Sequence, residues 1–153
     1  MALLAVLTIG VSLDVALVKR PPNYRVVTNA AQNILEGSNP YEPQEGLDYY
    51  KYSPLAGLLT APFLWMPDTL GMFLFVFLQL GLFLWALSTW ISSARLTGFS
   101  WQSIAVVAFF STVFDVTVAV QNCQVNVGIF ALMILATAQY AEGRFVRAGL
   151  VLS

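Results

Sequence analysis

The chain alternates between long apolar runs and short polar joints, with one long polar segment near its start. The apolar run Ala2–Val18 comes first, and the polar segment Asn23–Pro54 follows it. From Leu55 to Ser153 nearly every stretch is apolar, and the interruptions are only a few residues long. This pattern predicts an all-α membrane protein that holds the polar segment at a bilayer surface.

Three apolar runs predict membrane-spanning helices, namely Leu70–Ile91, Trp101–Val120 and Val127–Ala141. Ala2–Val18 is slightly short for the ~20 residues of a span. We expect it to be a retained helix, because no basic residue precedes it as in a signal peptide. The run Leu55–Met66 is bounded by two prolines and has the length of a re-entrant or interfacial segment. The expected fold is a polytopic transmembrane helical bundle.

Residues 1–153 are expected to form a single transmembrane domain. The last apolar run, Phe145–Ser153, is too short to cross a hydrocarbon core of roughly 30 Å. We therefore expect the chain to be the N-terminal part of a longer protein, with its bundle truncated at the C-terminus.

Residues 19–54 form a loop with its own helix and turn signals. Two prolines near its start prevent the first helix from continuing. The apolar spacing within Thr28–Glu36 predicts a short amphipathic helix lying against the membrane, and Gly37 provides its C-terminal stop. Carboxylates and tyrosines then surround Lys51. Such residues are typical of an aromatic belt at the interface, and they could equally bind a sugar and a phosphate.

Composition excludes several classes of protein and site. Of the 153 residues, 58% are hydrophobic and 10% are charged, against about 25% charged in soluble domains. The net charge of −1 offers no basic surface for a nucleic acid. Because the chain has no histidine, it excludes His-ligated metals and Ser-His-Asp triads. Cys123 is the single cysteine, so there is no internal disulfide. We expect neither a metal nor a cofactor.

Asp14 lies inside the first apolar run, where a carboxylate is costly. One interpretation is a carboxylate at the end of the helix that pairs with Lys19 and Arg20. The other is a residue of a functional site.

Polar and turn motifs recur along the chain in a defined order. They are Asn23-Tyr24, Ala30-Ala31, Leu35, Gly37, Asn39-Pro40-Tyr41, Tyr52-Ser53-Pro54, Pro62, Gln124-Val125-Asn126, Gly143-Arg144 and Ala148-Gly149. In order and spacing they resemble the motifs of glycosyltransferase family 87, which belongs to the GT-C superfamily of polytopic membrane glycosyltransferases. The resemblance runs from about Asn23 to the end of the chain.

This resemblance implies transfer of a hexose or a pentose from a polyprenyl-phosphate donor to a lipid or glycan acceptor. Because the last helix is too short and the helices that would complete a donor groove are not in the chain, we expect these 153 residues alone to transfer sugar poorly or not at all. The resemblance also implies a multi-pass protein of the bacterial plasma (inner) membrane, whose loop faces away from the cytoplasm. A non-enzymatic polytopic membrane protein, such as a transporter or an assembly subunit, is the alternative. A transporter predicts polar residues facing each other in mid-membrane, whereas here they gather at helix ends.

One position departs from the family's pattern. Where members commonly place an aspartate as catalytic base, this chain has Asn23, whose amide cannot accept a proton. Asp48 is the nearest replacement in the loop, and Asp14 is the second candidate. The chemistry needs a carboxylate that takes the proton of the acceptor hydroxyl. It also needs a cation, for which Lys51 is suited, to stabilise the departing lipid phosphate.

The remaining candidate residues are suited to holding a sugar, since tyrosine rings stack on it and amides hydrogen-bond its hydroxyl groups. They are Asn23, Tyr41, Tyr50, Gln121, Gln124 and Asn126.

A single composite site requires the loop and the polar segment Gln121–Asn126 to share one membrane face. They do so if Leu55–Met66 does not span, with Arg95, Arg144 and Arg147 on the opposite face. If that run spans, all seven cations fall on one side, as the positive-inside rule favours, and the two polar segments separate. We expect the first arrangement because of the resemblance.

Overall fold

The computed structural model describes residues 2–43, 45–93, 103, 107 and 114–152. Within these ranges every regular element is a helix, which confirms the all-α prediction there. The elements are α1 (Ala2–Asp14), the π-helical turn η1 (Val15–Lys19), α2 (Asn23–Leu35), α3 (Pro54–Thr60), the 3₁₀ turn η2 (Ala61–Trp65), α4 (Asp68–Ser93), α6 (Asn126–Ala141) and α7 (Phe145–Leu152).

The predicted long helices correspond to elements of the structure wherever it describes them. Leu70–Ile91 falls within α4, Val127–Ala141 falls within α6, and Ala2–Val18 forms α1 and η1. Most of Trp101–Val120 lies outside the described residues, and residues 114–121 are helical. Among the described residues α4 alone is long and apolar enough to cross a membrane. The described part of the chain therefore establishes one candidate span and leaves the polytopic bundle a prediction.

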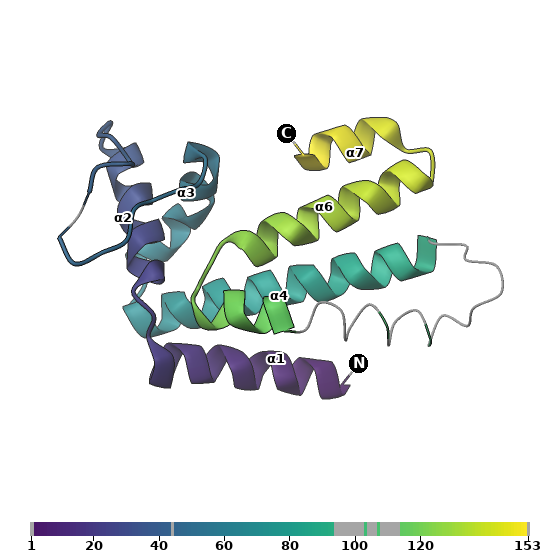
Figure 1. The fold of residues 1–153 in the computed structure, drawn as a ribbon, viewed down its shortest axis with the longest axis horizontal. Coiled ribbons are helices and arrows are strands. Elements are labelled where there is room, and N and C mark those ends of the chain that lie inside the picture. Colours follow the sequence, from purple (N-terminus) through teal and green to yellow (C-terminus); the bar gives the residue numbers. More distant parts are fainter. Residues whose placement is uncertain (1, 44, 94–102, 104–106, 108–113, 153) are drawn as a thin grey trace. The chain divides into compact units, whose positions relative to one another are not determined.

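Two compact units make up the chain. Unit 1 consists of Met1–Leu78 and Val120–Gln124, and unit 2 consists of Gln79–Ala119 and Val125–Ser153. In unit 1, α2 and α3 lie side by side (Figure 1). In unit 2, α6 and α7 fold back on each other, with Gly143 in the left-handed conformation that the tight turn needs.

The core of unit 1 forms where α2 and η2 pack on the first turns of α4. Tyr24 and Ala31 of α2 are 2% and 0% exposed. The Tyr24 ring meets the Phe75 ring edge to face, with 5.9 Å between ring centroids. Phe63 also meets the Phe75 ring edge to face, at 5.7 Å. Edge-to-face pairs of this kind stabilise beyond the area they bury. The packing fixes α2 against the start of the candidate span.

Helix α2 begins at Asn23, five residues before the predicted Thr28, because Pro21 and Pro22 precede its first turn without preventing it. It ends as Gly37 predicts: Gly37 has a φ of +73°, and the Ser38 amide donates to the Asn33 carbonyl at 2.7 Å. These are the features of a Schellman stop.

The predicted apolar face of α2 is correct at three of its four positions. Ala30 and Ala31 are buried and Ile34 is partly buried, whereas Leu35 is 54% exposed. Leu35 is the last residue of the helix.

The run Leu55–Met66 forms α3 and η2, which together cover Pro54–Trp65. Twelve helical residues reach ~18 Å, which is short of a core of roughly 30 Å. One face is buried and includes Thr60, whose hydroxyl lies 3.3 Å from the Val27 carbonyl oxygen of α2. The opposite face is apolar and exposed, with Trp65 at 78%. This length and this amphipathic character favour the interfacial or re-entrant reading over a span.

Candidate functional site

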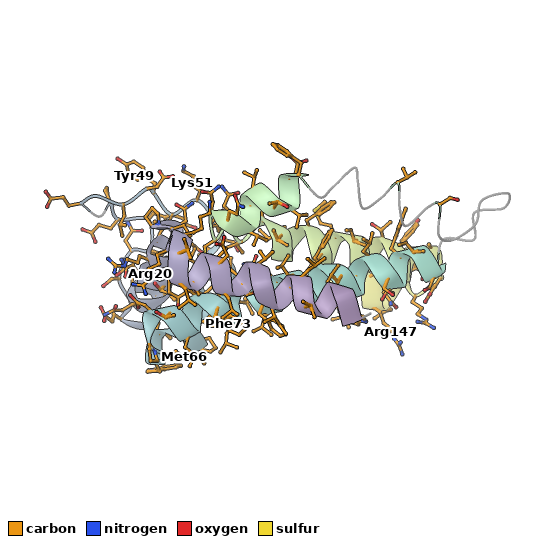
Figure 2. The ribbon with its side chains drawn as sticks, turned by 90° about the horizontal axis from the view of Figure 1, so that it is seen from below. Arg20, Tyr49, Lys51, Met66, Phe73 and Arg147 are labelled. Atoms are coloured by element: carbon orange, nitrogen blue, oxygen red, sulfur yellow. The ribbon has the colours of Figure 1, made fainter. Side chains whose placement is uncertain are left out.

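Asp48 and Lys51 form an ion pair in the loop of unit 1. The Lys51 ammonium donates to Asp48 Oδ2 at 3.0 Å, and the Tyr49 amide donates to Oδ1 at 2.9 Å. Hydrogen bonding from Lys51, then from Tyr49, holds the pKa of Asp48 below its ordinary value. Both side chains are exposed, and Lys51 and Tyr49 lie at the outer edge of unit 1 (Figure 2). The pair presents an ionised carboxylate and an ammonium to solvent.

Three tyrosines gather beside this ion pair. The Tyr50 ring lies 5.8 Å from that of Tyr41 and 5.7 Å from that of Tyr52. Tyr50 is 6% exposed and donates to the Ser53 carbonyl at 2.7 Å, whereas Tyr41 is 44% exposed. Burial raises the pKa of Tyr50 to about 12. Tyr41 therefore has the accessible ring, and Tyr50 supports it from beneath.

Glycine makes room for Tyr50 on helix α3. A β-carbon at Gly57 would lie 3.1 Å from the Tyr50 hydroxyl and 2.7 Å from Ile34 Cδ1. The absence of a side chain at this position lets the loop and the end of α2 approach the same turn of α3.

Asn23 is the first residue of α2 and is partly buried. Its neighbour Tyr24 turns into the core, and burial, followed by the negative charge of Asp68, raises the pKa of Tyr24 to about 12. Asp68 also forms an exposed ion pair with Arg25 at 3.5 Å. A carboxylate and a guanidinium thus stand beside the position where the family's base is expected. Our sequence analysis did not select this pair, because Asp68 starts a helix and that position alone explains it.

The polar segment Gln121–Asn126 forms a turn that leads into α6. Gln121 ends a helix, and Cys123 is fully buried with a φ of +49°. Gln124 is partly buried, and Asn126 is exposed as the first residue of α6. Cys123 lies close enough to Tyr24 to influence its pKa. Within unit 1, Cys123 of the turn and Tyr24 at the start of α2 therefore lie in the same region.

Asp14 occupies the last position of α1 and is exposed. Among the described residues no ion pair joins it to Lys19 or Arg20, so the predicted helix-end pairing is not present there. Arg20 adopts a φ of +44°, and its amide donates to the Val15 carbonyl at 2.8 Å. The left-handed conformation of Arg20 ends the helix at this point.

Of the predicted site residues, the structure groups Asp48, Lys51, Tyr41 and Tyr50 in one part of the loop. It places Tyr24, the neighbour of Asn23, within electrostatic range of Cys123 in the turn. Whether these two groups form one site remains a prediction. In the described ranges no three His, Cys, Asp or Glu side chains gather in a way that could hold a metal ion.

A comparison with protein families found one match. The profile of glycosyltransferase family 87 matches residues 50–153, which is more than half of the chain. The match includes Tyr50, Lys51 and the turn, whereas Asn23 and Asp48 precede it. No curated protein and no solved structure matched the chain. Its match over this length makes the chain a member of glycosyltransferase family 87.

Proposed function

We propose that this chain transfers a sugar from a polyprenyl-phosphate donor to a lipid or glycan acceptor at the extracytoplasmic face of a bacterial inner membrane. Membership of glycosyltransferase family 87 is the observation that carries the proposal. The activity class, glycosyl transfer, follows from the family. The lipid-linked donor, a hexose or pentose as the sugar, and the acceptor are the proposed refinements.

The ion pair of Asp48 and Lys51 supplies the two kinds of group that the reaction requires. The acceptor hydroxyl loses its proton as its oxygen attacks the anomeric carbon, and a carboxylate within hydrogen-bond reach takes that proton. The bond from the anomeric carbon to the phosphate oxygen breaks, and the phosphate leaves as an anion that a cation stabilises. Asp48 is the proposed base, and Lys51 is the proposed partner of the phosphate.

The geometry of this pair suggests how substrate binding activates the base. Hydrogen bonding from Lys51 lowers the pKa of Asp48 in this structure. When a phosphate binds, Lys51 turns from Asp48 to the phosphate oxygens. The pKa of Asp48 then rises toward its ordinary value, which makes the carboxylate a stronger base. The exposed ring of Tyr41 is placed to stack on the sugar, while the amides of Asn23, Gln121, Gln124 and Asn126 are proposed to hydrogen-bond its hydroxyl groups.

The tests use membranes from cells that produce the chain, with radiolabelled polyprenyl-phosphate hexose and polyprenyl-phosphate pentose as probes. We expect Asp48→Asn to lower transfer by about 10²–10⁴-fold. Glu45→Gln, a matched change of an exposed carboxylate in the same loop, should leave transfer within about twofold. If Asp48→Asn is active and Asp14→Asn is not, Asp14 is the base. Because the chain alone is expected to transfer sugar poorly, the donor class would be contradicted by the absence of transfer from both probes by the chain and by a longer protein that carries it.

A further inference from the structure

Helix α6 and the second half of α4 run parallel within unit 2 (Figure 1). The Gly128 amide donates to Gln79 Oε1 at 3.1 Å, and the Ser93 hydroxyl lies 2.5 Å from Glu142 Oε1. Each pair joins residues that are 49 positions apart in the chain, so α4 and α6 keep the same pairing register from the start of α6 to its end. Between these two hydrogen bonds the Phe83 ring stacks on the Phe130 ring, with 6.1 Å between ring centroids.

This register fixes how deep α6 begins along the candidate span. Gln79 follows the first residue of α4, Asp68, by eleven positions, or ~16 Å along the axis. The charged Asp68 belongs at the membrane surface, and the hydrocarbon core is roughly 30 Å thick. Gln79 therefore lies near the middle of the core, and so does Gly128.

Gln79, a polar residue within the apolar helix α4, provides a hydrogen-bond acceptor for the start of α6. The first four amide groups of a helix have no partner within it, and an unsatisfied amide in hydrocarbon is costly. Gly128 is the third residue of α6, and its amide is one of these groups. The Gln79 side chain accepts from it, and a β-carbon at position 128 would lie in ordinary contact with the same oxygen, at 3.5 Å.

We propose that Gln79 is a positioning residue that holds the start of α6 near mid-depth of the membrane. The polar residue at that end, Asn126, is then recessed into the bilayer instead of lying in a loop at its surface. This inference rests on the proposed function where it assigns the Asn126 amide to sugar binding. On that basis the sugar is bound below the headgroup level, at a depth that Gln79 sets.

A fluorescence measurement tests the depth without any activity. In a Cys123→Ser background a bimane is attached to Leu70→Cys, Leu78→Cys or Ile129→Cys, all at exposed positions. The vesicles contain phosphatidylcholine with a nitroxide at a shallow or a deep position of the acyl chain. Because facing residues of α4 and α6 are 49 positions apart, Ile129 lies level with Leu80. The bimane at Ile129→Cys should therefore be quenched to the same extent as the bimane at Leu78→Cys, and most strongly by the deep nitroxide. Quenching of Ile129 that matches the shallow Leu70 would overturn the proposal.

Enzyme kinetics test the positioning role. Gln79→Met keeps the length of the side chain and removes its acceptor oxygen, whereas Gln79→Glu keeps an acceptor. With polyprenyl-phosphate hexose as the probe, or the pentose if only that is transferred, we expect Gln79→Met to raise KM about tenfold with kcat within about twofold. We expect Gln79→Glu to restore KM, and Leu80→Met, a matched change in the same helix, to leave it unaltered.

Two results would overturn this role for Gln79. One is an unchanged KM in Gln79→Met, and the other is a Gln79→Glu variant as impaired as Gln79→Met. If neither the chain nor a longer protein that carries it transfers either sugar, the proposed function fails, while the fluorescence measurement still decides whether α6 starts within the membrane.

Discussion

The hydroxyl group of Tyr24 lies against the backbone of Gly71, so closely that a β-carbon at position 71 would overlap it. Gly71 belongs to the first turn of α4, and Tyr24 belongs to the first turn of α2. The missing side chain in α4 therefore lets the start of α2 rest on the candidate span. Asn23, where the family's base is expected, takes its position from this contact.

We expect Gly71→Ala to destabilise the chain by about 1–3 kcal/mol, because the aromatic ring of Tyr24 is buried and cannot move aside without a backbone shift. Thermal unfolding in detergent can be followed with a thiol-reactive dye, since the single cysteine, Cys123, is fully buried in the folded chain. The variant should unfold at a lower temperature than the unaltered chain.

Two variants make this test specific. Gly81→Ala changes another glycine of α4 whose β-carbon would meet nothing within 4 Å, so it should not destabilise. Adding Tyr24→Phe to Gly71→Ala removes the overlapping oxygen and should recover part of the loss. If the double variant is no more stable than Gly71→Ala, the overlap is not the cause.

The hydrophobic pattern predicted much of the fold, because helix formation in apolar runs depends on local residue types. It located α4 and α6 within two residues of their observed ends and placed the stop of α2 at Gly37. It could not find the π-helical turn η1, which ends in the left-handed conformation of Arg20, because hydrophobic spacing does not reveal such a backbone conformation. It also started α2 too late, because a proline pair is compatible with both a helix end and a helix start.

The candidate site could be predicted only where its residues are close in sequence. Asp48 and Lys51 are three positions apart, and the loop alone brings them together. The contact of Arg25 with Asp68 and that of Gln79 with Gly128 join residues more than 40 positions apart. No spacing rule reveals such pairs, because tertiary packing determines them. The sequence did not predict a role for Gln79, because a single glutamine in an apolar helix forms no recognisable local pattern.

Thr60→Val should weaken the contact between α2 and α3. The buried Thr60 hydroxyl lies 3.3 Å from the Val27 carbonyl oxygen and 2.7 Å from that of Gly57. Valine has the same shape without the donor, so we expect a loss of about 1 kcal/mol, or a fall in Tm of roughly 2–4 °C. Thr137→Val removes a hydroxyl that is exposed and bonds only within its own helix. It should change Tm less, and an equal change in both variants would contradict the assigned role of Thr60.

Tyr50 should make the chain less stable in alkali. Burial raises the pKa of its phenol from 10.0 to about 12, so between these values the unfolded chain loses a proton that the folded chain keeps. Stability should therefore fall as pH rises from 10 to 12, and Tyr50→Phe should reduce that slope in thermal unfolding. Tyr49→Phe is the control, since Tyr49 is 61% exposed. If Tyr50→Phe leaves the slope unchanged, its phenol is not protected from ionisation.

The acid side of the rate profile should depend on Lys51. Lys51 lowers the pKa of Asp48, and a base works only above its own pKa, so kcat/KM for the free chain should fall only at a pH below the ordinary pKa of an aspartate. In Lys51→Met the carboxylate loses its partner, its pKa rises, and the fall in kcat/KM should move to higher pH. Lys51→Arg keeps a positive charge beside Asp48 and should keep the fall at low pH.

The control for this profile is Lys19→Met, which removes an exposed cation outside the loop's ion pair. It should leave the acid limb where it is. The profiles are measured with the polyprenyl-phosphate sugar that the unaltered chain transfers best, and each variant is first checked for folding at the lowest pH used. In Lys51→Met the acid limb of the profile could stay in place while overall transfer declines. That result would mean that Lys51 assists the reaction through the phosphate alone, and that a carboxylate other than Asp48 takes the proton of the acceptor.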